Sequence, residues 1–188
     1  MRLAGISALA LLAGLYLPPW EARAGPFPAH MLRHMGLVAG VAPLMVLAWP
    51  GVARRFAVPV ILAAVAEFAI VWAWHLPHLH GFAQLSFGGR VLEQVAFLAA
   101  GLAVWSGALH ARQALVGAGG LFLTSMHMTL LGALLVLAPS DLYAEICGRD
   151  PSLSGQQLGG ILMLAIGTPI YLVGALVLAA RVVREETA

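Results

Sequence analysis

The chain has 188 residues, of which 61% are hydrophobic and only 10% are charged. A soluble domain has roughly 45–50% apolar and 25% charged residues, so this composition indicates a protein built for a lipid bilayer. The net charge of +2 excludes the basic footprint of a nucleic-acid-binding protein. The single cysteine excludes an intramolecular disulfide and a two-thiolate metal site.

Six apolar segments follow one another along the chain. They cover approximately Leu3–Leu17, His30–Trp49, Phe56–Leu76, Val91–His110, Ala114–Ala138 and Leu158–Val183. A transmembrane helix needs about 20 apolar residues, a length that the last five segments satisfy and the first does not reach. We therefore predict an all-α fold, a polytopic bundle of six spans in a single transmembrane domain that covers residues 1–188.

The first segment has two interpretations. Met1-Arg2, the apolar run and Ala22-Arg23-Ala24 resemble the three parts of a secretory signal peptide. Alternatively, residues 1–24 contain a short first helix that ends at Pro18-Pro19. We favour the helix, because the proline pair lies well before the cleavage point that a signal peptide would need. Cleavage would leave a core of five helices in residues 25–188.

The arginines predict the orientation of the bundle, because cytoplasmic loops of membrane proteins are enriched in basic residues. One set of loops and ends carries an excess of arginine: Arg2, Arg54, Arg55, Arg112, Arg181 and Arg184. We expect these on the cytoplasmic side, together with both chain ends. The loops Pro18–Ala29, Pro77–Gly89 and Pro139–Gly155 then face outward, and the last is long enough to fold over the bundle as a lid.

Histidines gather at the predicted outward side. His30 and His34 are four residues apart, which places both on one face of a helix and about 6 Å apart in height. His75 ends the third segment at the same boundary, and Glu93 lies in the first turn of the fourth. Ionisable residues in a membrane segment indicate a functional site. We predict that these four side chains converge as metal ligands.

The remaining candidates are secondary. His78, Met35, Met126 and Asp150 lie near the same level or beside another buried histidine, and we treat them as secondary metal ligands. His80 follows His78 in a predicted loop. A histidine at a membrane boundary usually satisfies its nitrogens with water or carbonyl groups, and we interpret His80 in this way.

A second polar layer lies deeper. Glu67 is eight residues before His75, about 12 Å farther into the bilayer, and His127 lies near the midplane of the fifth segment. A carboxylate at the bilayer centre costs about 2.5–3.5 kcal/mol, so Glu67 should be protonated or paired, and His127 is the expected partner. We predict His127 as a metal ligand and Glu67 as a secondary one. The alternative for both is a structural hydrogen bond between helices.

The ligand types favour copper. Imidazole with thioether and without thiolate suits Cu(I), whereas imidazole with carboxylate suits Zn(II) or Cu(II). Met31 and Met35 beside the histidines shift the preference to copper. Heme is the competing cofactor, because facing histidines such as His34 and His75 can clamp it. No HExxH, nucleophile–base or nucleotide motif is present, and we predict that the protein is not an enzyme.

A series of short motifs runs in order through the chain. It consists of His30-Met-Leu-Arg-His34-Met, Ala42-Pro43-Leu44, Pro50, Trp74-His75-Leu-Pro77, Leu92-Glu93, Met126-His127, Leu131-Gly132, Asp150, Gln156-Gln157-Leu-Gly-Gly160 and Leu162-Met163. The series resembles the CtaG family of cytochrome c oxidase assembly factors, which are multi-span bacterial membrane proteins. Gln94 stands where relatives often have a histidine, and the chain is short for the family.

The resemblance implies a role in the maturation of heme-copper oxidases, in which the protein helps copper to reach the oxidase. The implied partners are an oxidase subunit or a periplasmic copper donor within the bacterial inner membrane, with the site facing the periplasm. Homo-oligomerisation is a further alternative. Competing functions are a heme-binding electron-transfer protein and an assembly scaffold without a ligand. A transporter is a weaker alternative, because no inverted repeat is evident.

Overall fold

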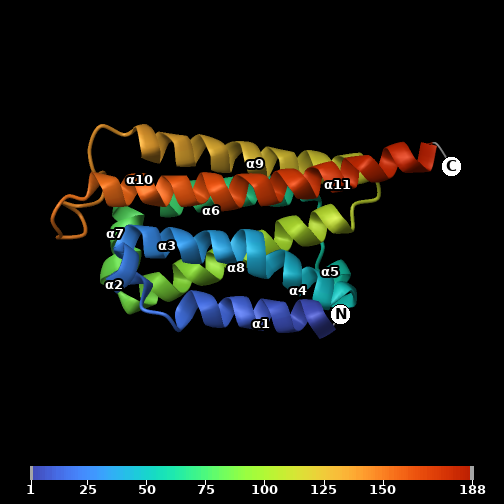
Figure 1. Ribbon diagram of the computed structural model, residues 1–188. Helices are drawn as coiled ribbons and strands as arrows, with labels where there is room; N and C mark the ends of the chain where they lie inside the picture. The colour runs from blue at the N-terminus through green and yellow to red at the C-terminus, as the bar shows by residue number, and fades with distance from the viewer. Residues whose placement is uncertain (1, 187–188) are drawn as a thin grey trace.

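The computed structural model describes residues 2–186, and all regular structure in this part of the chain is helical. The long helices lie side by side with their axes along a common direction, and both chain ends lie at the same end of the bundle (Figure 1). The predicted all-α bundle is therefore confirmed for these residues.

Eleven α-helices and two π-helical segments make up this described part of the chain. In order they are α1 (Arg2–Tyr16), α2 (Trp20–Ala24), α3 (Pro26–Met35), η1 (Gly36–Val41), α4 (Ala42–Ala48), α5 (Pro50–Arg55), α6 (Val60–Trp74), α7 (Pro77–Leu85), α8 (Phe87–Leu109), α9 (Ala114–Leu137), α10 (Leu153–Leu162), η2 (Met163–Gly167) and α11 (Thr168–Glu186). The π-helical segments continue the helices on either side of them, so α3, η1 and α4 form one rod, and α10, η2 and α11 form another.

Four of these rods are long and apolar enough to cross a membrane. They are Pro26–Ala48, Phe87–Leu109, Ala114–Leu137 and Leu153–Arg184. Helices α6 and α7 pass the same test only together, and they are bent by 73° at the break between them. With α1 only 15 residues long, the structure supports four or five spans, and the predicted number of six is not confirmed.

Two of the three predicted outward loops are largely helical, so those loop predictions are wrong. Residues 77–89 contain α7, which begins with Pro77 in its first turn, a position where the fixed φ of proline favours a helix. Residues 18–29 contain α2 and the first turn of α3. Gly25 separates these two helices with a φ of 91°, a conformation that glycine adopts without steric penalty.

Helix α1 packs against glycines of the η1 segment. A Cβ atom at Gly36 would lie 2.5 Å from Cδ1 of Leu15, and one at Gly40 would lie 2.5 Å from Cδ2 of Leu11. Two small residues four positions apart allow close approach of helices in a membrane. The α1 leucines fill the grooves that these glycines leave, so α1 is part of the bundle.

The π-helical segment η1 leaves one carbonyl group without a helical partner. In a π-helix the N–H of residue i+5 bonds to the carbonyl oxygen of residue i, and the residue five after Val38 is Pro43, which has no N–H. The indole N–H of Trp105 donates to the Val38 oxygen at 2.9 Å, and the hydroxyl of Tyr171 donates to it at 3.1 Å. Side chains from α8 and α11 thus satisfy the carbonyl that the proline exposes, as buried membrane helices require.

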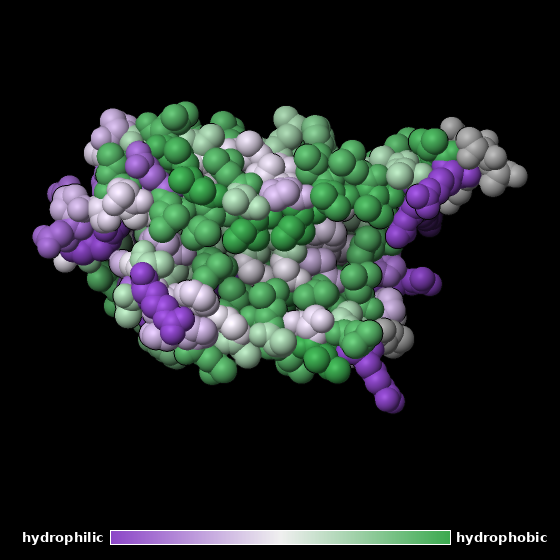
Figure 2. All heavy atoms as spheres, viewed as in Figure 1, coloured by the Kyte–Doolittle hydropathy of each residue, from purple (hydrophilic) through white to green (hydrophobic). Residues whose placement is uncertain are grey.

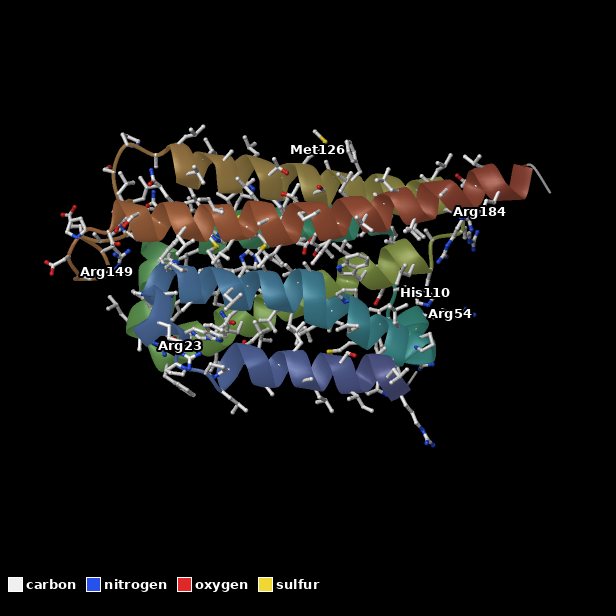
Figure 3. The ribbon with its side chains drawn as sticks, viewed as in Figure 1. Arg23, Arg54, His110, Met126, Arg149 and Arg184 are labelled. Carbon is white, nitrogen blue, oxygen red and sulfur yellow. The ribbon has the colours of Figure 1, made fainter. Side chains whose placement is uncertain are left out.

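Charged residues separate to the two ends of the bundle, and the surface between them is predominantly apolar (Figure 2). Arg23 and Arg149 lie at one end, and Arg54, His110 and Arg184 lie at the other (Figure 3). We call the end with Arg23 and Arg149 the histidine end. The start of α3 and helix α7 lie there, and both carry histidines (Figure 1). The separation agrees with the predicted grouping of arginines, whereas the assignment of one end to the cytoplasm stays a prediction.

Candidate metal centre

Three histidines from two helices meet inside the histidine end. The ring centroids of His30 and His34 on α3 are 6.2 Å apart, and the ring of His75 lies 5.6 Å from the first and 5.2 Å from the second. One nitrogen from each ring can be chosen so that all three lie within 4.8 Å of one another. None of the three residues is more than 5% exposed. The structure therefore brings together the three histidines that the sequence singled out; we call them the inner set.

Local sequence explains how these rings arrive at one point. Gly25 and Pro26 start α3 one turn before His30, and the four-residue spacing places His34 on the same face. His75 follows α6 as its C-terminal cap, and its backbone N–H still bonds to carbonyl groups of the last turn. The helix stops there because the residue before Pro77 takes an extended conformation.

The nitrogens of the inner set are largely unpaired. Nδ1 of His75 lies 2.6 Å from the carbonyl oxygen of Val71, and Nε2 of His75 has no partner among the described residues. Neither ring nitrogen of His34 has a partner, and its ring stacks on Phe97 with centroids 3.8 Å apart. Buried polar atoms are normally hydrogen-bonded, so unpaired nitrogens in one cluster are a signal of a ligand. Neutral imidazole nitrogens are common metal ligands.

A second group of ligand atoms shares His30 with the first. It consists of His30, His80 of α7 and Glu93 of α8, whose candidate atoms also lie within 4.8 Å of one another; we call it the outer set. Oε2 of Glu93 lies 3.3 Å from Nδ1 of His30 and accepts a hydrogen bond from Gln94 at 3.1 Å. Oε1 of Glu93 is buried without a partner.

The interpretation of His80 as an interfacial residue is wrong. Its side chain is buried, its ring lies 4.8 Å from that of His30, and its Nδ1 has no partner. The bend between α6 and α7 turns this residue back over α3. Pro77 could have indicated this from the sequence, since proline in the first turn is a helix-start signal.

The irregular segment between α9 and α10 covers the two sets. Tyr143 is buried, stacks on Phe27 at 4.8 Å, and its ring lies 4.5 Å from that of His80. The Tyr143 hydroxyl donates to the backbone oxygen of His75 at 3.0 Å. The segment Pro139–Gly155, which includes the start of α10, therefore lies over the histidines, as its length suggested, and we call it the covering segment.

The predicted pairing of Glu67 with His127 is wrong. Glu67 accepts a hydrogen bond from the hydroxyl of Tyr171 on α11 at 2.7 Å. His127 is buried against Phe68, with ring centroids 5.5 Å apart, and neither of its nitrogens has a partner. The structure does not place His127 or Glu67 in the inner or the outer set. Glu67 instead forms an interhelical hydrogen bond, which was the alternative interpretation.

The secondary candidates lie elsewhere. Met126 is 55% exposed and points away from the bundle (Figure 3). Met35 is fully buried, with its sulfur only 2.7 Å from where a Cβ of Gly167 would lie, so it packs on η2. His78 and Asp150 are exposed. Neither His78 nor Asp150 belongs to the inner or the outer set. The two sets contain only histidine and glutamate, so they include no methionine.

Fold and site together define a class: an α-helical membrane protein with a buried cluster of imidazole and carboxylate groups near one end. The chain matches the family model described as cytochrome c oxidase caa3 assembly factor over residues 3–185, and it belongs to this family. The resemblance found in the sequence is thereby confirmed over nearly the whole chain. No curated protein and no solved structure gave a significant match.

Proposed function

We propose that this protein helps to deliver copper to a heme-copper cytochrome c oxidase and that the inner set binds the copper. The observation that carries the proposal is the convergence of His30, His34 and His75 within ligand distance in a buried environment. The membership in an oxidase assembly family supports the maturation role. Because the family is one of assembly factors, we also expect that this chain does not catalyse a reaction.

The residues of the inner set fit a soft or borderline metal ion. Their donors are nitrogens only, which suit copper or zinc rather than magnesium or calcium. The His75 carbonyl contact already fixes one tautomer: Nδ1 donates its hydrogen to Val71, so Nε2 retains the lone pair that a metal needs. The client oxidase contains copper, which favours copper over zinc as the ion that is handled.

The location of the inner set supports delivery from the periplasmic side. The set is carried by α3 and by the end of α6 next to α7, which lie at the histidine end (Figure 1), opposite the end that carries Arg54 and Arg184 (Figure 3). If the arginine-rich end is cytoplasmic, as the positive-inside rule predicts, the site faces the periplasm of a bacterial inner membrane. A periplasmic copper donor and an oxidase subunit are the partners that this location favours.

The geometry favours copper over the heme alternative. A heme between His34 and His75 would need a planar slot, yet the two ring centroids are only 5.2 Å apart and Phe97 stacks directly on His34. A scaffold without any ligand would leave several buried nitrogens unpaired, with the free-energy cost that such groups carry.

Metal retention tests the proposal. The protein is purified in detergent, stripped with a chelator, loaded with Cu(I) and passed over a competing chelator before its metal is measured. We expect wild type to retain equimolar copper and His34→Ala/His75→Ala to lose it. His78→Ala, which alters an exposed histidine, is the matched control. Equal retention by wild type and the double variant, or a Soret band in the purified protein, would overturn the proposal.

A cellular experiment tests the delivery step. Deletion of the gene should yield an oxidase that contains its hemes but lacks copper, and wild-type protein should restore the copper while His34→Ala/His75→Ala should not. If the oxidase from the deletion strain has its full copper content, the delivery role is wrong even if the protein binds copper.

A further inference from the structure

The outer set contains a buried carboxylate whose negative charge a bound cation would neutralise. The Glu93 carboxyl is fully buried, and one of its oxygens has no hydrogen-bond partner in the part of the chain that the structure describes. The other oxygen contacts only a neighbouring amide and the Nδ1 atom of His30. An isolated buried carboxylate is costly unless it is paired or coordinates a metal. His80, whose Nδ1 atom is buried without a partner among the described residues, belongs to the same group.

Two cavities reach the outer set but not the deeper histidines. One, of about 330 Å³, is lined by His30 and Glu93, and the other, of about 180 Å³, is lined by His80 and Cys147. Neither is lined by His34 or His75. An ion arriving through either cavity therefore meets the outer set first.

Two of the three arginines that line these cavities are paired with carboxylates, which offsets their repulsion of a cation. Arg33 lines the larger cavity, and its guanidinium is paired with the carboxylate of Glu21, with one N–O distance of 3.0 Å. Arg149 lines the smaller cavity and is paired with Asp141 at 2.9 Å. Arg90 also lines the larger cavity, where its guanidinium donates a hydrogen bond to the backbone oxygen of Gln84 at 3.2 Å.

His30 belongs to both sets and lies between them. Its ring is 4.8 Å from that of His80 and 5.6 Å from that of His75. We propose that the outer set is an entry site for the same copper ion, which passes to the inner set by ligand exchange at His30. This inference rests on the proposed function, since it assumes that the inner set binds copper.

The exchange needs no oxidant or reductant. The ion keeps its charge, bonds to His80 and Glu93 break while bonds to His34 and His75 form, and a His30 nitrogen is available to the ion in both sets. The Glu93 carboxylate keeps its hydrogen bond from Gln94 after the ion has moved on. Because His30 offers a ligand in both sets, the ion does not have to lose all its ligands at once in an apolar interior.

The experiment separates the rate of loading from the amount retained. Cu(I) is supplied as a chelator complex, and its transfer to the protein is followed over time for wild type, His80→Gln/Glu93→Gln and His78→Gln. Loss of a group that supports a metal site typically costs about 10–100-fold in affinity, and we expect loading of the double variant to be slower by at least about tenfold. Its final retained copper should equal that of wild type, because its inner set is intact. His78→Gln is the same change at an exposed position of α7.

A second measurement identifies the outer ligands directly. In His34→Ala/His75→Ala, Cu(II) should give an electron paramagnetic resonance spectrum with coupling to two nitrogens, and the further change Glu93→Gln/His80→Gln should abolish that spectrum. This signal does not depend on the rate of loading.

The outcomes distinguish the two proposals. Unchanged loading in His80→Gln/Glu93→Gln overturns the entry site and leaves the copper site standing. Complete loss of retained copper in this variant also overturns it, because the two sets would then be a single site. A wild-type protein that retains no copper overturns the proposed function itself.

Discussion

The Nδ1 atom of His75 lies 2.6 Å from the carbonyl oxygen of Val71, one turn earlier in α6. A carbonyl oxygen only accepts hydrogen bonds, so Nδ1 carries the hydrogen and Nε2 has the free lone pair. The backbone oxygen of His75 in turn accepts a hydrogen bond from Tyr143. The imidazole ring of His75 is therefore held by α6, and the backbone of His75 is held by the covering segment.

The Tyr143 hydrogen bond gives a first prediction. Tyr143→Phe keeps the stacking on Phe27 but removes the hydroxyl that holds the end of α6. Groups that orient metal ligands contribute about 10–100-fold to affinity, and we expect Cu(I) affinity to fall by up to about tenfold. A competition titration with a Cu(I) chelator measures this effect. An unchanged affinity would show that the covering segment does not position His75.

Much of the helical architecture can be predicted from the apolar segments, but the positions at which the helices begin and end cannot. Phe56–Leu76 reads as one continuous apolar run, yet α6 begins at Val60, because the residue before Pro59 avoids the helical conformation. The run ends in a sharp bend into α7 for the same reason at Pro77. These two prolines are why one predicted span is a bent pair of helices.

The candidate site was predictable where it depends on local spacing. The four-residue interval between His30 and His34 places both on one face whatever the rest of the chain does. His80 was not predictable in this way, because its position depends on the direction in which α7 leaves the bend. Tyr171, whose hydroxyl donates to Glu67, lies 104 residues later, and the packing of both α6 and α11 against α9 brings the two side chains together.

Close packing at Gly101 gives a second prediction. A Cβ atom at this position of α8 would lie 2.9 Å from the Cα atom of Val38, a backbone atom that cannot move aside cheaply. Overpacking of this kind typically costs about 1–3 kcal/mol, so Gly101→Ala should lower the free energy of unfolding by that amount.

Gly119 provides the matched control for Gly101. A Cβ atom there meets nothing within 4 Å. Alanine is better than glycine in a helix by up to about 1 kcal/mol, so Gly119→Ala should be neutral or stabilising. Unfolding in mixed micelles with increasing denaturing detergent measures both variants. Equal effects of the two changes would contradict the close approach of α8 to η1.

The covering segment should become less stable at low pH. Burial raises the pKa of the Asp141 carboxyl, but amide hydrogen bonds from Ser152 and Tyr143 and the guanidinium of Arg149 outweigh it and hold the pKa below its usual range. An unfolded aspartate has a pKa of about 3.9. Since the folded value is lower, the stabilisation is complete above the unfolded value and is lost as the pH falls through the folded one.

Hydrogen exchange of the peptide that covers residues 139–155 measures this effect. After correction for the intrinsic rate, protection should stay constant between neutral pH and about pH 5 and decrease below about pH 4, near the unfolded pKa of aspartate. Asp141→Asn should show the lower protection already at neutral pH. Asp150→Asn, which alters an exposed carboxyl of the same segment, should behave as wild type.

The hydroxyl of Tyr171 gives the last prediction, which concerns stability rather than metal binding. Its single hydrogen is shared between Glu67 at 2.7 Å and the Val38 carbonyl at 3.1 Å, and the Trp105 indole N–H donates a separate hydrogen bond to that carbonyl. Tyr171→Phe therefore removes the 2.7 Å hydrogen bond of Glu67, and loss of a partner by a buried polar group costs about 1–3 kcal/mol. Replacing both partners, as in Tyr171→Phe/Glu67→Met, should recover most of that loss, because no buried carboxyl then lacks a partner. The free energy of unfolding of the single and double variants tests this, and a double variant less stable than Tyr171→Phe would show that Glu67 has another partner.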